Sequence, residues 1–129
     1  MHVALVIEDD FSTRSAIAQL LMRRGYAVCE AFLPDPIPLV PSLDVIVSDV
    51  VVRPDVDSVR AWARSIQDRF GVPLVLVTAR EAIAAAGPDA LGVTDVIRKP
   101  FDLGDLVARI DRAVAAAPEQ RAGGWNLVA

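Results

Sequence analysis

The chain has 129 residues, of which 53% are hydrophobic and 23% charged, so it can bury one core and would be crowded as two domains. Its net charge is −4 and its thirteen basic residues are spread along the chain, which excludes the basic patch of a nucleic-acid-binding protein; we expect no direct contact with DNA. The single cysteine, Cys29, cannot form an internal disulfide and fits a reducing compartment. Without an apolar run of membrane-spanning length or a signal-peptide pattern, we expect a cytoplasmic protein that does not bind the membrane.

The chain opens with a strand and a helix. Val3–Ile7 is a continuous apolar run, typical of a strand that is covered on both faces. Three acids follow at its carboxyl end: Glu8, Asp9 and Asp10. The next apolar residues recur at helical spacing, which predicts a helix that Ser12 or Thr13 caps and that ends near Arg24.

Prolines mark the second crossover. Ala27–Ala31 predicts a short second strand. The segment after it contains four prolines: Pro34, Pro36, Pro38 and Pro41. Because proline fixes the backbone and removes a donor, we expect a loop here, with the second crossover helix missing or irregular. The next apolar run predicts a third strand, Val45–Asp49, which carries the carboxylate of Asp49 at its end.

The second half of the chain continues the alternation of helix and strand. Ser58–Phe70 has helical spacing with Trp62 on its apolar side, and Val72–Val77 predicts a fourth strand followed by Thr78. Glu81–Ala86 predicts a short helix, because glycine and proline interrupt the pattern directly after it.

The last two predicted elements are a strand and a helix. Val93–Arg98 predicts a fifth strand, which Lys99 and Pro100 close. Asp102 is well placed to cap a helix that runs to about Ala117. Residues 118–129 show no pattern, and we expect a flexible tail after a domain that spans residues 1–117.

Alternating strands and crossovers predict an α/β fold, in which a doubly wound sheet of five parallel strands carries helices on both faces. Ligands bind beyond the carboxyl ends of the strands in such a sheet. Five side chains are expected to meet at that edge: Glu8, Asp9, Asp49, Thr78 and Lys99. Lys99 is the only lysine among the thirteen basic residues, and its ammonium group approaches a phosphate or carboxylate as a point charge, unlike a planar guanidinium.

The order of these residues resembles the receiver domain of bacterial two-component response regulators. That family has an acid pair after the first strand, Asp after the third, Thr-Ala after the fourth and Lys-Pro after the fifth. The resemblance covers roughly Val3 to Ala117 and implies a flavodoxin-like fold. Arg14 matches the basic residue six positions after the family's first acid, and this match sets the register of the acid pair.

The resemblance also implies a role for each residue at the edge of the sheet. Asp49 would accept a phosphoryl group from a phosphohistidine, while Thr78 and Lys99 would bind its oxygens. The ligands of Mg²⁺ would be Glu8, Asp9, Asp49 and the backbone carbonyl of Val51. The bond between Lys99 and Pro100 would be cis.

The chemistry of the acids independently favours a hard divalent cation. Three converging carboxylates repel one another, and a cation that prefers oxygen ligands offsets this repulsion. Zinc fits less well, because the chain has no cluster of Cys and His; its only histidine, His2, precedes the first strand and is expected to be a surface residue. Phosphoryl transfer needs an in-line nucleophile and neutralised charge, which Asp49, the cation and Lys99 could supply.

Several positions depart from the family pattern. Asp49 lies 40 positions after Asp9, a few fewer than usual, and the proline-rich segment replaces the second helix. The Met-Pro that usually follows the acceptor is displaced by one residue, so that Pro54 follows Arg53. Val96 stands where the family commonly has an aromatic ring that rotates on phosphorylation, so we expect the signal to be passed on by another structural change.

These observations predict a single-domain response regulator that is not an enzyme beyond its own phosphorylation and dephosphorylation. We expect its partners to be a sensor histidine kinase or histidine phosphotransfer protein and a separate effector protein, and a homodimer stays open. One alternative is a pseudo-receiver that binds partners without phosphorylation. Another is a phosphatase of the haloacid dehalogenase type, which needs an acid two residues after its nucleophile, where this chain has Val51.

Overall fold

Strands and helices alternate along the chain in the computed structural model, which describes residues 1–32, 42–49 and 54–117. In chain order the elements are β1 (Val3–Ile7), α1 (Phe11–Arg23), β2 (Ala27–Ala31), β3 (Val45–Asp49), α2 (Val56–Phe70), β4 (Leu74–Thr78), α3 (Glu81–Leu91), β5 (Asp95–Arg98) and α4 (Leu103–Ala116). The predicted proline-rich loop and the predicted tail both lie outside the described residues.

The five strands form one parallel sheet in the order β2-β1-β3-β4-β5. Its middle strands are buried on both faces, because each consists mainly of Val, Leu and Ile. The sheet order reverses between β1 and β3, which places a crevice at the carboxyl ends of these strands. The predicted α/β, doubly wound fold is therefore confirmed.

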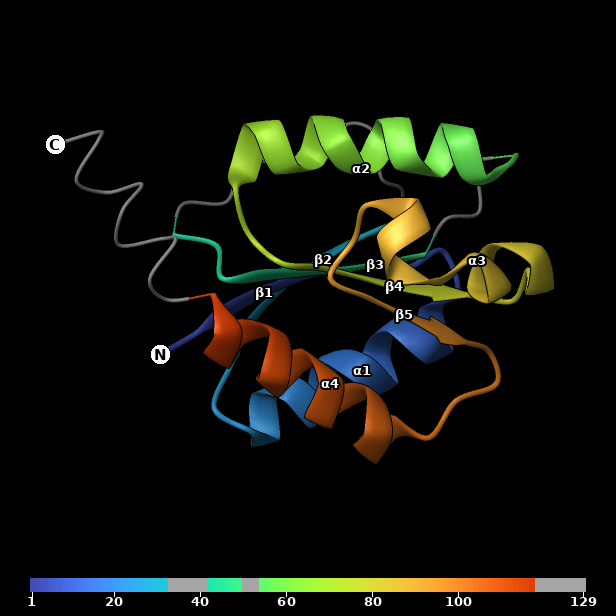
Figure 1. Cartoon of the computed structure of the whole chain (residues 1–129). Coiled ribbons are helices and arrows are strands. Elements are labelled where there is room, and N and C mark those ends of the chain that lie inside the picture. Colours follow the sequence, from blue (N-terminus) through green and yellow to red (C-terminus); the bar gives the residue numbers. More distant parts are fainter. Residues whose placement is uncertain (33–41, 50–53, 118–129) are drawn as a thin grey trace, which may run out of the picture.

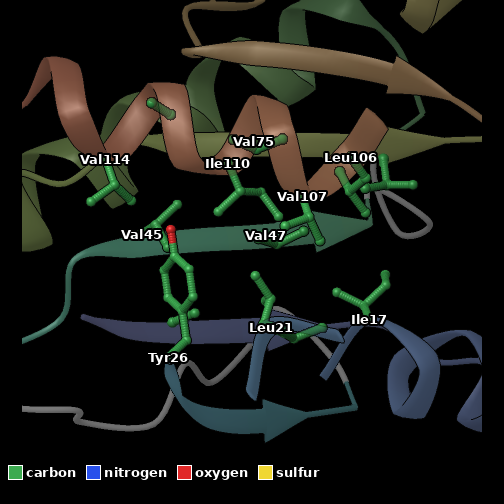
Figure 2. Packing of buried hydrophobic residues seen from close by; sticks show 14 of the residues in the cluster. Ile17, Leu21, Tyr26, Val45, Val47, Val75, Leu106, Val107, Ile110 and Val114 are labelled. Carbon is green, nitrogen blue, oxygen red and sulfur yellow. The ribbon is translucent and has the colours of Figure 1, made fainter. Parts of the chain in front are cut away.

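The helices cover the sheet from both sides (Figure 1). Helices α1 and α4 lie together on one face and α2 lies on the other. The first face is packed by apolar side chains of α1 and α4, and Figure 2 shows Val107 and Ile110 beside Val45 and Val47 of β3. On the second face α2 and α3 share a core that includes Trp62, whose predicted place in the core is confirmed.

The helix starts follow local capping chemistry. The predicted cap of α1 by Ser12 or Thr13 is wrong, because Asp10 has an extended backbone and its carboxylate accepts from the Thr13 amide at 2.8 Å. Helix α2 begins at Val56, two residues before the predicted Ser58, since Asp55 caps it in the same way. The predicted cap of α4 by Asp102 is confirmed, with an amide-to-carboxylate distance of 2.8 Å at Asp105.

Helix α3 extends beyond its predicted end at Ala86. Gly87 breaks the helical geometry with a φ of 82°, a region that glycine enters without strain, and the chain then turns helical again as far as Leu91. Pro88 starts this second segment, where a missing backbone donor costs little. The result is a kinked pair of short helices instead of one helix and a loop.

Three further details concern the strands and the chain ends. Strands β4 and β5 begin at Leu74 and Asp95, each two residues later than predicted. The bond between Lys99 and Pro100 is cis, as the family resemblance implies. Among the described residues, each helix is too short or too polar to span a bilayer.

Candidate functional site

The carboxyl ends of four strands bring the predicted site residues to one edge of the sheet. Glu8 directly follows β1, and Asp49 is the last residue of β3, paired with Val77 of β4. Thr78 ends β4, and Lys99 follows β5 directly. Because all the strands are parallel, these residues lie together at the carboxyl edge of the sheet.

Lys99 joins two of the acids. Its Nζ donates to Glu8 Oε1 and to Asp49 Oδ2, each at 2.6 Å. The side chain of Glu8 is 2% exposed, that of Asp49 11% and that of Lys99 22%, so this ion triad is largely removed from water. Removing Lys99 would leave two poorly solvated carboxylates without their counterion.

Asp9 completes a cluster of three acids. One carboxylate oxygen from each of Glu8, Asp9 and Asp49 lies within 4.8 Å of the others, although Asp9 itself is exposed. Oxygen ligands at this spacing suit a small, hard cation such as Mg²⁺, which keeps several waters and takes only a few carboxylates from a protein. Val51, whose carbonyl was expected to be a further ligand, lies outside the described residues.

The electrostatics of the cluster show how strongly its charges interact. The pKa of Glu8 is raised to about 7, first by burial and then by Asp9 and the negative charge of Asp49, while hydrogen bonds from Lys99 and the Asp10 amide oppose the shift. Burial alone would lower the pKa of Lys99, but its hydrogen bonds to Asp49 and Glu8 outweigh this and raise the pKa overall. Lys99 is therefore a cation at neutral pH, whereas Glu8 titrates close to neutral pH.

Thr78 forms the wall of the site on the β4 side. It is buried, its Oγ1 accepts a hydrogen bond from the Arg80 amide at 3.0 Å, and its carbonyl accepts from the Lys99 amide at 2.8 Å. The threonine hydroxyl is therefore held at the start of α3, and the backbone of Lys99 is tied to the end of β4.

Two arginines at the site were not predicted to have a role. Arg80 Nη1 donates to the carbonyl of Pro54 at 3.1 Å, which links the turn before α3 to the turn before α2. Arg14, which in the sequence marks only the register of the acid pair, is 8% exposed and donates to the carbonyl of Glu8 at 2.7 Å. A basic residue four positions into a helix gives no sign in the sequence that it folds back onto the preceding strand.

An open groove adjoins Lys99 on the α1 side of the site. Its volume is about 580 Å³, and its walls are mostly apolar. The lining residues are Ser12, Thr13, Ala16, Ala79, Lys99, Pro100, Phe101 and Leu103. The groove therefore lies beside Lys99, between the start of α1 and the turn that precedes α4.

Comparisons with known proteins agree with this geometry. The chain is 37% identical over 119 residues to the transcriptional regulatory protein CseB of Streptomyces coelicolor, which covers 88% of this chain and 48% of that protein. It spans about a quarter to a half of the length of the curated relatives that it matches. A scan against models of protein families finds no match.

Solved structures share the fold. The receiver domain of HemR from Leptospira biflexa superposes with a TM-score of 0.69 at 24% identity, covering 88% of this chain and 94% of that one. The response regulator TrrA of Thermotoga maritima, in complex with Mg²⁺ and BeF, gives a TM-score of 0.70 at 17% identity, covering 88% and 99%.

The strand order and the acidic edge of the parallel sheet are those of a flavodoxin-like α/β domain. The chain belongs to the receiver-domain family of two-component response regulators. Members of this family are phosphorylated on an aspartate, act with histidine kinases and generally bind Mg²⁺.

Proposed function

We propose that Asp49 is the phosphoacceptor of this receiver domain. The observation that carries the proposal is the bridge from Lys99 Nζ to both Asp49 and Glu8, at 2.6 Å each, inside a cluster of three acids. One oxygen of Asp49 would attack the phosphorus of a phosphohistidine, forming an acyl phosphate as the bond from phosphorus to nitrogen breaks. The imidazole leaves with the electron pair and takes up a proton from water.

The surrounding residues would share the charge of the transferred group. Glu8, Asp9 and Asp49, with the carbonyl of Val51, would hold Mg²⁺, which when bound supplies positive charge to the phosphoryl oxygens. Lys99 would exchange its bond to an Asp49 oxygen for one to the phosphoryl group. The Thr78 hydroxyl, a donor as well as an acceptor, would leave the Arg80 amide and donate to the phosphoryl group.

The proposed partners follow from the same chemistry. A sensor histidine kinase or a histidine phosphotransfer protein would supply the phosphoryl group, and the apolar groove beside Lys99 would give the donor's imidazole ring a surface to lie against. We propose that the receiver domain spans residues 1–117 and passes its signal to a separate effector protein or to a second copy of itself. Such a domain catalyses nothing beyond its own phosphorylation and dephosphorylation.

Intact-mass analysis after incubation with Mg²⁺ and a small phosphodonor tests the acceptor. The parent protein should gain the mass of one phosphoryl group, and Asp49→Asn should gain none. Asp68→Asn is the matched control, because this aspartate is exposed near the end of α2 that lies away from the site. Labelling of Asp49→Asn at the parent's level would overturn the assignment.

The other outcomes separate the alternative functions. A parent protein that gains no mass would be a pseudo-receiver, and one that rapidly releases free phosphate without a stable adduct would be a phosphatase.

Thermal unfolding tests the metal. Mg²⁺ that binds only the native protein must raise the melting temperature relative to the protein in EDTA. We expect this rise in the parent and its loss in Asp49→Asn. A parent protein that melts at the same temperature with and without Mg²⁺ would contradict the metal part of the proposal.

A further inference from the structure

Arg14 is a buried arginine whose hydrogen bond goes to the main chain of the acid pair. It lies in the second turn of α1 and is 8% exposed. Its Nη1 donates to the carbonyl oxygen of Glu8 at 2.7 Å, within the range of a strong charge-assisted bond. That carbonyl belongs to the peptide that joins Glu8 to Asp9, two of the three acids of the cluster.

The backbone around Glu8 is held on both sides. The Glu8 amide donates to the carbonyl of Ala31 at 3.1 Å, which continues the pairing of β1 with β2. The Asp10 amide donates to Glu8 Oε2 at 3.2 Å. Arg14 adds a third restraint, because its bond to the Glu8 carbonyl limits rotation of the peptide between Glu8 and Asp9.

Arg14 is itself held in place by three side chains. Its Nε lies 3.3 Å from Glu30 Oε1, and its Cζ lies 4.7 Å from the centroid of the Phe32 ring and 5.5 Å from that of Phe11. A planar guanidinium can contact both rings and donate from Nε and Nη1 at once, whereas an ammonium group cannot. The arrangement therefore selects arginine and fixes its side-chain conformation.

We propose that Arg14 is a positioning residue for the metal site: it clamps the peptide between Glu8 and Asp9 so that both carboxylates converge on Asp49. This inference rests on the proposed function, since it assigns Arg14 to the same acidic site. Replacing a residue that orients metal ligands without binding the metal itself typically lowers metal affinity by about 10- to 100-fold. A role in folding alone would lower stability and leave the affinity of the folded protein unchanged.

Calorimetric titration of the unphosphorylated protein with Mg²⁺ tests the proposal. Arg14→Lys and Arg14→Met should each raise the Kd for Mg²⁺ by about tenfold. Arg109→Lys is the matched control, because Arg109 also donates from two nitrogens, to Asp95 and Asp105, but belongs to α4. Its Kd should stay within about twofold of the parent.

Phosphorylation gives a second readout. The labelling rate of Arg14→Lys should reach half its maximum at a higher Mg²⁺ concentration than the parent and approach the parent's rate at saturation. An unchanged Kd in Arg14→Lys, with a folded amide NMR spectrum, would overturn the proposal. If Arg14→Met fails to fold, the lysine variant decides.

The outcome can be separated from failure of the proposed function. If the parent protein binds no Mg²⁺, the metal part of that function fails, and the amide resonances of Asp9 and Asp10 in metal-free protein test the clamp directly. Displaced resonances in Arg14→Lys would support the clamp, and unchanged resonances would refute it.

Discussion

Replacing Glu8 by glutamine should stabilise the metal-free protein at neutral and alkaline pH. Burial, Asp9 and the charge of Asp49 raise the pKa of Glu8 from 4.5 to about 7 in the native state. The native protein therefore binds more protons than the unfolded chain between these values, so the free energy of unfolding falls as pH rises through this window. From about pH 5 to about pH 8 the loss amounts to roughly 2 to 3 kcal/mol. Glutamine keeps an acceptor for Lys99 and does not titrate, so Glu8→Gln should avoid this loss.

Urea unfolding in EDTA, followed by circular dichroism at several pH values, measures the effect. The carboxyls of Asp10 and Asp55 have lowered pKa values and titrate below the window, so they do not obscure it. Glu81→Gln is a suitable control, because Glu81 is exposed in α3 and pairs with the exposed Arg98. If Glu8→Gln is no more stable than the parent at about pH 8, the burial and repulsion that raise the pKa of Glu8 are weaker than we infer.

Three further predictions concern other parts of the molecule. Tyr26 is the only tyrosine, and burial and its 2.7 Å bond to Asp111 raise its pKa well above 10.0. The absorbance of its phenolate should therefore appear only above pH 10.0, and there the raised pKa makes the free energy of unfolding fall as pH rises. A titration midpoint near 10.0 in the native protein would contradict this. Ile110 is fully buried between α4 and the sheet, so Ile110→Ala should lower the free energy of unfolding by about 2 to 5 kcal/mol, and an unchanged urea midpoint would contradict this. Arg80→Met removes the hydrogen bond to the carbonyl of Pro54. In amide NMR spectra with a beryllofluoride-type phosphoryl mimic, this variant should therefore show chemical-shift changes only at residues that touch the mimic. Identical shift changes in α3 of parent and variant would show that Arg80 does not transmit the response.

The meeting of the site residues was predictable from the sequence because it depends on topology. Buried parallel strands are recognisable as apolar runs, and their carboxyl ends must lie at one edge, so Glu8, Asp49, Thr78 and Lys99 had to come together. The protonation state of Glu8 was not predictable, because it depends on burial by residues that are distant in the sequence. The same holds for Arg14, whose role depends on how α1 packs beside the carboxyl end of β1 and against β2.

The limits of several elements were not predictable, because competing local signals are equally good in a sequence. Asp10, Ser12 and Thr13 can all cap a helix, and only the extended backbone of Asp10 shows which one does. Glycine followed by proline reads as the end of a helix, yet Gly87 turns the chain and a second helical segment follows. At β4 the apolar run Val72–Val77 hides the point where pairing starts, because apolar residues before a strand and within it look alike.

Lys99 has a practical consequence, because it carries the only side-chain amine in the sequence. Reagents that acylate amines would find this single side chain, and they would find it protonated and held between two carboxylates, where it is a poor nucleophile. Any event that draws the ammonium group away from Glu8 or Asp49 changes how fast it reacts. The chain thus contains its own chemical reporter of the acidic edge, readable by mass spectrometry without an introduced label.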